Sequence, residues 1–500
     1  MRVPIPEAFR VKHILLFAIA IFLAQLATGT SVYFALLVFA FLLLFSFSYN
    51  IAGGITYSSG GYIFFNGTLT LILGIICKII LFEPAERNLE SPLLTMGVYC
   101  AGMFSMGVAA YFSRRLRTKR ALLQDISVGR GMRDAALGCL VLGVSLGVLV
   151  QIIGHAPGTL GSALVQLNRF TLMAILLGTT YEIRTSGGER STNWIVWTAG
   201  LYTFFIGLVS FSKEGTFLGP FCWLIPAIFL RYNFKVKQLV LVGLGIFVMS
   251  YYLVPFSQYG RNFRDETSTF SSDLNTATDL LSHPERTREA YFAQASVNEY
   301  NTGPHFYDKP EGLFDRLQMV AIDDSLINLT DHGEVYGLSP TIESFLNTLP
   351  RLIYRNKETK GFGNIYAHEL GIVGEDDSTT GISFSPSAEA FHEATWFGVL
   401  VVQPLVLFLV FFVCDSVCGD VRLSPWGLLL TSLFAHVAPE GGLGGPIYVM
   451  VYGMESIIAV ALLAKYVLPI VGGILTGGKK SEVEKTQDFS LGAGAAAQRR

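Results

Sequence analysis

Charged residues are scarce in this sequence, and their scarcity excludes an ordinary soluble protein. They make up 15% of the 500 residues, whereas hydrophobic residues make up 51%. A soluble domain carries about 25% charged residues. The composition therefore predicts an all-α polytopic membrane protein. The net charge of −2 says little, because charge in such proteins matters by its location.

Two further absences narrow the class of function. All six cysteines lie in or beside apolar runs and none falls in the longest polar segment, so we expect no disulfide framework. The sequence also contains no GxxxxGK[ST], no GxGxxG and no kinase motif set. Chemistry driven by a nucleotide is therefore not expected. We likewise expect no cofactor and no nucleic-acid partner.

Long apolar runs dominate most of the chain. A membrane helix needs ~20 mostly apolar residues, and on this basis we predict about twelve transmembrane helices. The first follows Arg2, Arg10 and Lys12, as in a signal peptide, but it lacks a small-residue cleavage site and is interpreted as a retained helix. The predicted spans are 13–28, 31–48, 62–82, 93–112, 134–153, 163–181, 193–211, 215–231, 237–256, 390–414, 424–438 and 446–470.

Lysine and arginine in the short loops predict the orientation of these spans. The loop 113–133 is strongly basic, whereas 83–92 contains only Arg87 and 154–163 contains neither residue type. We therefore expect both termini in the cytosol. The predicted organisation is nine spans in 1–256, an external loop domain in 257–388, three spans in 389–470 and a disordered cytosolic tail in 471–500.

The external segment is too long for a structureless loop, which rarely exceeds ~12–15 residues in a compact domain. We expect it to fold as a mostly helical subdomain. Helical patterns are visible over 311–330 and over 339–349, and the second begins with a predicted Ser339 cap followed by Pro340.

Three cationic pieces lie on the predicted outer side. The first is the turn "FSKEG", with Lys213, and the second is "YGRNFR", after the ninth span. The third is the stretch 347–371. Arginine binds phosphate through a planar fork, so these pieces are candidates for holding an anion. The alternative is that each cation pairs with a nearby carboxylate or caps a helix. The candidate anion-binding residues are Arg351, Arg261, Arg264, Lys213, Arg355 and Lys357.

A general base is predicted in the same region. His368 is the first candidate because its unperturbed pKa lies near the working pH, and the alternative is a solvated loop histidine. Glu214 and Glu389 are the next candidates. Glu369, His392 and Glu393 are further alternatives. No metal site is predicted. "EAFHE" lacks a second histidine. The pairs Asp323–Asp324 and Asp376–Asp377 could hold a divalent cation, but the favoured interpretation is that they are not metal ligands.

The order of these features resembles the bacterial oligosaccharide repeat-unit polymerases, the O-antigen and exopolysaccharide polymerases of the Wzy type. Those proteins have ten to fourteen membrane helices and a large external loop. "LPRLIYRNKETKGFGNIYAHELG" (349–371) and "TTGISFSPSAEAFHEATWFGVLV" (379–401) look like the end of that loop. "LVSFSKEGTFLGP" (208–220) is similar to a basic segment near the middle of such chains, with Lys213 where an arginine is common.

The resemblance implies a glycosyltransferase of the cytoplasmic membrane that joins repeat units carried on a polyprenyl diphosphate. The cations would stabilise the leaving diphosphate, and His368, Glu214 or Glu389 would accept the proton of the attacking sugar hydroxyl. The expected partners are the lipid-linked glycan, membrane lipid, a chain-length regulator and a flippase.

Three alternatives use the same sequence features differently. An O-antigen ligase would use the same donor and a lipid-core acceptor. A transferase with a monosaccharide donor is less favoured, because the first predicted external loop, Thr28 to Thr30, contains no carboxylate. A glycolipid transporter would be expected to show internal repeats, broken helices and midplane charges. No repeat is visible, and only Lys78 and Arg169 are clear charges inside spans.

Overall fold

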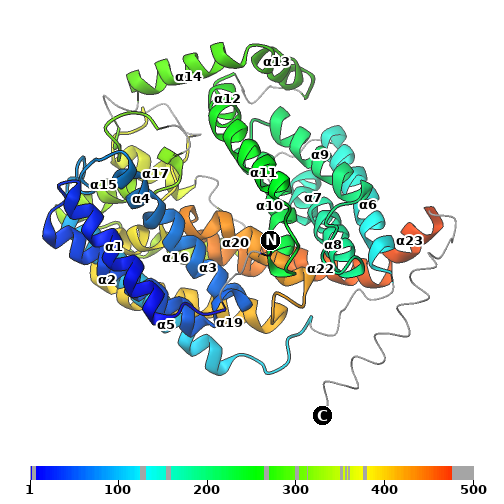
Figure 1. Cartoon of the computed structure of the whole chain (residues 1–500), viewed down its shortest axis with the longest axis horizontal. Coiled ribbons are helices and arrows are strands. Elements are labelled where there is room, and N and C mark those ends of the chain that lie inside the picture. The colour runs from blue at the N-terminus through cyan, green and yellow to red at the C-terminus, as the bar shows by residue number, and fades with distance from the viewer. Residues whose placement is uncertain are drawn as a thin grey trace.

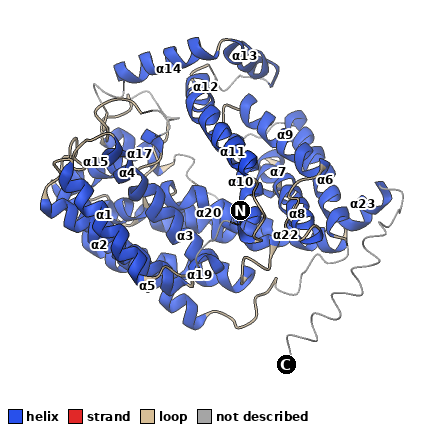
Figure 2. Ribbon diagram, viewed as in Figure 1, coloured by secondary structure: helices blue, strands red, loops and turns tan. Residues whose placement is uncertain are grey.

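The regular structure of the described chain is helical. The computed structural model describes residues 2, 7–123, 131–153, 159–263, 270–298, 303–311, 314–349, 353–354, 357, 361–374 and 380–475. Within these ranges the only β-type pairings are two isolated bridges, Arg2 with Asn233 and Phe384 with Gly441, and Figure 2 accordingly draws helices and loops alone. The predicted all-helical fold class is thus confirmed for the described part.

The helices follow one another closely along the chain. In order they are α1 (Val11–Ala27), α2 (Val32–Ala52), α3 (Ser58–Gly67), α4 (Leu73–Ile80), α5 (Pro92–Leu116), α6 (Met132–Ile153), α7 (Leu160–Leu167), α8 (Phe170–Thr185), α9 (Trp194–Val209), α10 (Lys213–Phe229), α11 (Val236–Val248), α12 (Val254–Arg261), α13 (Phe270–Ser282), α14 (Pro284–Asn298), α15 (Val320–Asp331), α16 (Ser339–Thr348), α17 (Phe362–Glu369), α18 (Pro386–Phe397), α19 (Gln403–Cys418), α20 (Pro425–Glu440), α21 (Gly444–Tyr448), α22 (Met454–Tyr466) and α23 (Leu468–Leu475). Short 3₁₀ turns cover Gly54–Thr56 and Phe314–Arg316, and π turns cover Thr68–Ile72, Met249–Leu253, Gly398–Val402 and Val449–Gly453.

Eight helices of the described chain are long and apolar enough to cross a membrane, and several of them join consecutive elements. Val11–Ala27 and Trp194–Val209 are apolar but shorter. Each of the twelve predicted spans overlaps one or more helices, but 163–181 covers parts of both α7 and α8, and α10 and α20 have only 17 and 16 residues and contain proline. A helical membrane protein is therefore supported, while the number of twelve crossings and their orientation stay predictions.

Helix α20 lies between two groups of helices (Figure 1). On one side α2 packs on α5, α5 on α19, and α20 on α3. On the other side α8 packs on α6, α9 and α10, and α10 contacts α20. Trp426, Leu429 and Phe434 of α20 are fully buried, because both groups bury their apolar faces against this helix.

The segment 257–388 contains helices that share their core with the neighbouring apolar helices. Leu326 of α15 and Tyr366 of α17 are buried in one cluster with Val98 of α5 and Leu443 beside α21. The predicted helix over 311–330 is wrong in its first half, since α15 begins only at Val320. The helix over 339–349 is confirmed as α16, but its N-cap is Leu338, so the predicted Ser339 cap is wrong.

The predicted start of the disordered tail is also wrong. Helix α23 runs from Leu468 to Leu475 and packs along α6, because its run of Leu, Ile and Val can bury one face there. The rest of the predicted tail, 476–500, lies outside the described residues.

Candidate functional site

Two of the predicted cationic pieces meet at Phe211. The carbonyl of Phe211 accepts hydrogen bonds from the Ser257 hydroxyl (2.7 Å) and from Arg261 Nε (3.2 Å). Ser212 then caps α10 by accepting from the Gly215 amide, so Lys213 and Glu214 form the first turn of that helix. The turn "FSKEG" and the end of α12 are therefore in direct contact.

The turn at Phe211 is strained. Phe211 has φ 49°, a left-handed conformation that bulky residues rarely adopt. Its ring is buried and packs against the backbone of Gly260, where an added Cβ would overlap the ring. Strain of this kind persists only where the surrounding structure holds it, and it is frequent at functional sites.

Glu214 lies beside a histidine from another part of the chain. Its Oε2 is 3.9 Å from Nε2 of His436 on α20, and the two side chains are 45% and 49% exposed. The neighbours of His436 on the other face of α20 are buried, so this histidine points out of an otherwise apolar helix. A carboxylate next to an accessible imidazole is an arrangement suited to general base chemistry.

Lys357 lies beside two tyrosines. Its Nζ donates to the carbonyl of Asn347 (2.6 Å) and to the hydroxyl of Tyr452 (3.2 Å), which itself donates to the same carbonyl. Tyr452 lies in the π turn of the apolar helix pair α21–α22, and its ring is 5.0 Å from that of Tyr448. An ammonium group has three donors, so one N–H of Lys357 has no partner among the described residues.

Tyr448 connects these groups to Arg169. Tyr448 packs beside Tyr452 and lies within range of the charges of Arg169 and Glu214. Arg169 lies at the N-cap of α8, and its Nε is buried with no hydrogen-bond partner in the described chain. We call this group the open site, and it consists of Arg169, Glu214, Lys357, His436, Tyr448 and Tyr452.

A second polar group lies at α18 and is closed to solvent. Asp323, Glu389 and Glu393 are 0%, 8% and 1% exposed, and we call them the acid cluster. Asp323 accepts from the Tyr99 hydroxyl (2.7 Å) and from the Ser385 amide (3.0 Å). Glu389 accepts from the Leu443 amide, and Glu393 accepts from the Thr341 hydroxyl (2.7 Å).

Helix α18 is broken directly after the acid cluster. Ala394 (φ −155°, ψ 31°) and Thr395 (φ 52°, ψ −138°) are not helical. The break frees the carbonyls of His392 and Glu393, which accept from the amides of Tyr336 and Gly337 at 3.0 Å each. A break within a predominantly apolar helix is tolerated where the freed backbone groups find partners inside the protein.

Burial perturbs the titration of two carboxyl groups near α18. It raises the pKa of Asp323 to about 7, although hydrogen bonds from Ser385 and Tyr99 oppose the shift. Burial also raises the pKa of Glu369, with a smaller contribution from the nearby Glu334. Desolvation disfavours the charged form of a carboxyl group, so both groups hold a proton more tightly than in water.

The predicted site residues fall into separate groups. Glu214 and Lys357 belong to the open site, and Lys213 and Arg261 lie at the Phe211 turn. Glu389 belongs to the acid cluster. His368 is half-buried on α17, but the histidine that joins the carboxylates is His392, whose Nε2 is 3.1 Å from Glu369. The predicted residues Arg264, Arg351, Arg355, Asp376 and Asp377 lie outside the described residues.

Sequence reasoning missed several members of the open site. His436 carried a usable signal, because an ionisable residue inside an apolar helix is by default a functional candidate. Arg169 carried the same signal, as one of the two clear charges within the predicted spans. Tyr448 and Tyr452 carried none, because tyrosine is common near membrane interfaces.

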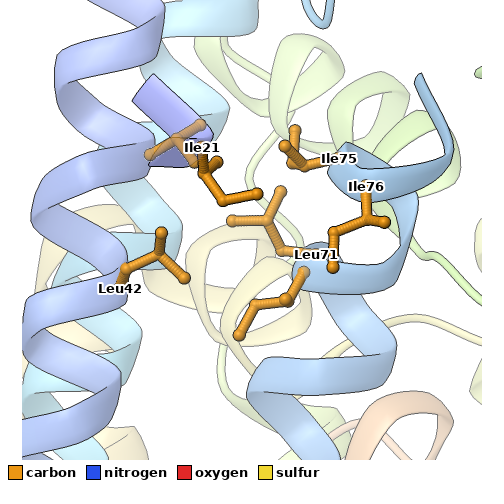
Figure 3. A pocket seen from close by; sticks show the side chains of 7 residues that line it. Ile21, Leu42, Leu71, Ile75 and Ile76 are labelled. Atoms are coloured by element: carbon orange, nitrogen blue, oxygen red, sulfur yellow. The ribbon is translucent and has the colours of Figure 1, made fainter. Parts of the chain in front are cut away.

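The pocket and the remaining acidic residues of the described chain offer fewer groups that could bind or transform a substrate. The small pocket between α1, α2 and the α3–α4 helix is lined only by aliphatic side chains, Ile21, Val38, Leu42, Leu71, Ile72, Ile75 and Ile76 (Figure 3). Within the described ranges, histidine, cysteine, aspartate and glutamate form no group of three or more that could hold a metal ion. Asp324 instead accepts from the amides of Glu90 and Ser91 and from the Thr95 hydroxyl.

Comparison with known proteins identifies no relative, since no family model, curated protein or solved structure matches this chain.

Proposed function

We propose that this protein is a glycosyltransferase that polymerises oligosaccharide repeat units carried on a polyprenyl diphosphate, at the outer face of a bacterial cytoplasmic membrane. The observation that carries the proposal is the open site. It combines two cations, two phenols and a carboxylate beside a histidine, contributed by segments far apart in the sequence. The sequence resemblance to Wzy-type polymerases is independent support.

The transfer needs charge stabilisation at the leaving group. An acceptor sugar hydroxyl attacks the anomeric carbon of the donor, and the bond from that carbon to the diphosphate oxygen breaks. The diphosphate leaves with the electron pair. We assign its binding to Lys357, which has one N–H without a partner among the described residues, and to Arg169, whose Nε has no partner there either. Fixed cations at a developing negative charge are a major source of catalysis.

The transfer also needs a proton acceptor. We assign this role to Glu214, with His436 beside it as the second titratable group. Both side chains are about half exposed, so a large glycan acceptor can reach them. The predicted cations Arg351, Arg264 and Arg355 remain candidates for the same diphosphate.

The test is a gel of surface glycan from a deletion strain that is complemented with single variants. We expect Lys357→Ala and Arg169→Met to collapse the ladder of chain lengths to a single repeat, as in the deletion strain. The matched control is Lys309→Ala, which removes an exposed lysine from the same segment. Membrane levels of each variant are measured alongside. An unchanged ladder in the deletion strain would overturn the proposal.

The same gel distinguishes a polymerase from a ligase or a transporter. A ligase transfers the same donor to a lipid core, so its loss removes even the single-repeat product. Loss of a transporter also removes all product, so the gel does not separate it from a ligase. A purified transporter, however, leaves purified lipid-linked donor unreacted. Formation of polymer from purified donor by the purified protein is the outcome expected for a polymerase.

A further inference from the structure

The acid cluster contains three buried carboxyl groups and no buried base. The charged groups that act on the pair are Asp323, which acts on Glu389, and Glu389, which acts on Glu393. No lysine or arginine of the described chain is among them. An ionised carboxylate is very costly to bury without a cation. Within the described chain the cluster therefore lacks a countercharge, which a proton or a metal ion would supply.

Hydrogen bonding around the pair Glu389–Glu393 is incomplete. Oε1 of Glu393 is buried and has no partner within the described ranges. The same is true of the hydroxyl groups of Tyr366 and Tyr62, both of which are fully buried. Tyr366 interacts electrostatically with both glutamates, and Tyr62 with Glu389. Two phenol groups and one oxygen of Glu393 are thus buried without partners in the described chain, and such groups are rare in folded proteins.

A proton fits this arrangement better than a metal ion. No group of acids in the described chain is arranged to hold a metal. One proton removes one negative charge and adds an O–H donor. The unpartnered oxygen of Glu393 can carry that proton or accept a hydrogen bond from the protonated group. We propose that Glu389 and Glu393 form a proton-binding site, in which one carboxyl group stays protonated at a pH at which a glutamate in water is ionised.

His392 is a buried histidine on the same helix as the pair, and both of its ring nitrogens have partners. Its Nε2 is 3.1 Å from Glu369, whose side chain is 31% exposed, and its Nδ1 is 2.9 Å from the Thr330 hydroxyl. The Tyr366 ring packs edge-on against His392 at 4.9 Å, and its hydroxyl interacts with Glu369, Glu389 and Glu393. The titratable groups around the pair come from each packed element: Asp323 from α15, Glu369 and Tyr366 from α17, Tyr62 from α3 and His392 from α18.

Asp415 of α19 provides a matched control for a buried carboxylate. Its side chain is 4% exposed, which is similar to the exposed fractions of Glu389 and Glu393. It accepts from the hydroxyls of Ser58 (2.6 Å) and Ser59 (2.7 Å) and from the Ser59 amide (3.2 Å), at the N-terminus of α3. Several donors and a helix N-terminus stabilise the charged form. We therefore expect Asp415 to be ionised and to contribute no protonated carboxyl group.

The test is infrared spectroscopy of the purified full chain in lipid nanodiscs, in H₂O and in D₂O, above the pKa of Asp323. We expect a protonated-carboxyl C=O band that shifts in D₂O. Glu389→Gln and Glu393→Gln should each remove or weaken it, while Asp415→Asn should leave it unchanged.

Two further measurements test the proposal even if a glutamine variant does not fold. The wild-type band needs no variant, and Tyr366→Phe should shift its frequency by removing one buried hydroxyl. Absence of the band in wild type would overturn the proposal. So would a band that survives both glutamine variants, or one that is lost only in Asp323→Asn.

Discussion

The open site and the acid cluster contain similar residues in opposite surroundings. Each has glutamate, histidine and tyrosine at hand, but the open site adds Arg169 and Lys357, and its Glu214 and His436 are about half exposed. The acid cluster has no lysine or arginine from the described chain, and its three carboxyl groups are almost completely buried. Burial and countercharge, rather than residue type, thus separate a group suited to bind a charged ligand from one suited to hold a proton.

The largest expected effect is a loss of polymer formation when the open site is changed. Glu214→Gln removes the proposed base at the open site without disturbing a buried group. We expect polymer formation from purified donor to fall by about 10²-fold or more, with no change in melting temperature. The matched control Glu334→Gln neutralises another exposed glutamate and should retain activity. Equal activity of both variants would remove Glu214 from the mechanism.

The second prediction concerns a buried charge that does have a partner. Lys78 is fully buried, with Nζ 2.8 Å from Glu83 and 5.0 Å from the centre of the Phe306 ring. Removing one partner of a buried pair leaves the other uncompensated. We therefore expect Lys78→Ala to lower the free energy of unfolding by about 3–5 kcal/mol, measured by thermal unfolding in detergent.

An exposed ion pair on the same segment is the control. Arg87 is 2.9 Å from Asp308, and both side chains are accessible to solvent. Exposed pairs contribute less than about 1 kcal/mol, so Arg87→Ala should unfold almost as wild type does. If both variants lost the same stability, burial would not be the property that distinguishes charged groups in this molecule.

The third prediction concerns pH. The pKa of Asp323 is about 7 in the folded state and 3.8 in the reference state, so the folded state binds the proton more tightly. This contribution to stability is complete below pH 3.8 and is lost as the pH rises through about 7. It amounts to at most about 4 kcal/mol.

Melting temperatures measured across that range test the sign. Wild type should lose stability as the pH rises, and Asp323→Asn should flatten this dependence. Glu369 has a raised pKa as well and should leave a residual slope in the same direction. A wild-type protein that gained stability over this range, or an unchanged slope in the variant, would contradict the assignment.

Much of the fold was readable from apolar runs and basic loops, because these follow from the chain's local composition. The predicted spans overlap helices for that reason, and eight helices of the described chain are long and apolar enough to cross a membrane. The break in α18 could not be predicted from the sequence. Thr395 adopts a positive φ with no glycine or proline beside it, so only tertiary packing can account for the conformation.

The candidate site was less predictable than the fold. His368 and Glu369 are adjacent in sequence, yet it is Glu369 that contacts His392, since consecutive helix positions point in different directions. Glu214 and Lys357 were predicted from local charge, and both belong to the open site. Tyr448 and Tyr452 depend on how α21 and α22 pack, which a single sequence does not specify.

The smallest expected effect tests what holds the acid cluster in place. Thr395 lies in a region of φ and ψ that glycine tolerates and a β-branched residue does not, at a cost of about 1–3 kcal/mol. Glycine elsewhere in a helix costs about 1 kcal/mol. We expect Thr395→Gly to match or slightly exceed wild-type stability, whereas Ala390→Gly, in the regular first half of α18, should be destabilising. The protonated-carboxyl band should persist in Thr395→Gly, because the bonds of Glu389 to Leu443 and of Glu393 to Thr341 do not depend on the strained residue. If Thr395→Gly lost as much stability as Ala390→Gly, the break would be an adaptable bend, and the contrast between a rigid acid cluster and an accessible open site would have to rest on burial alone.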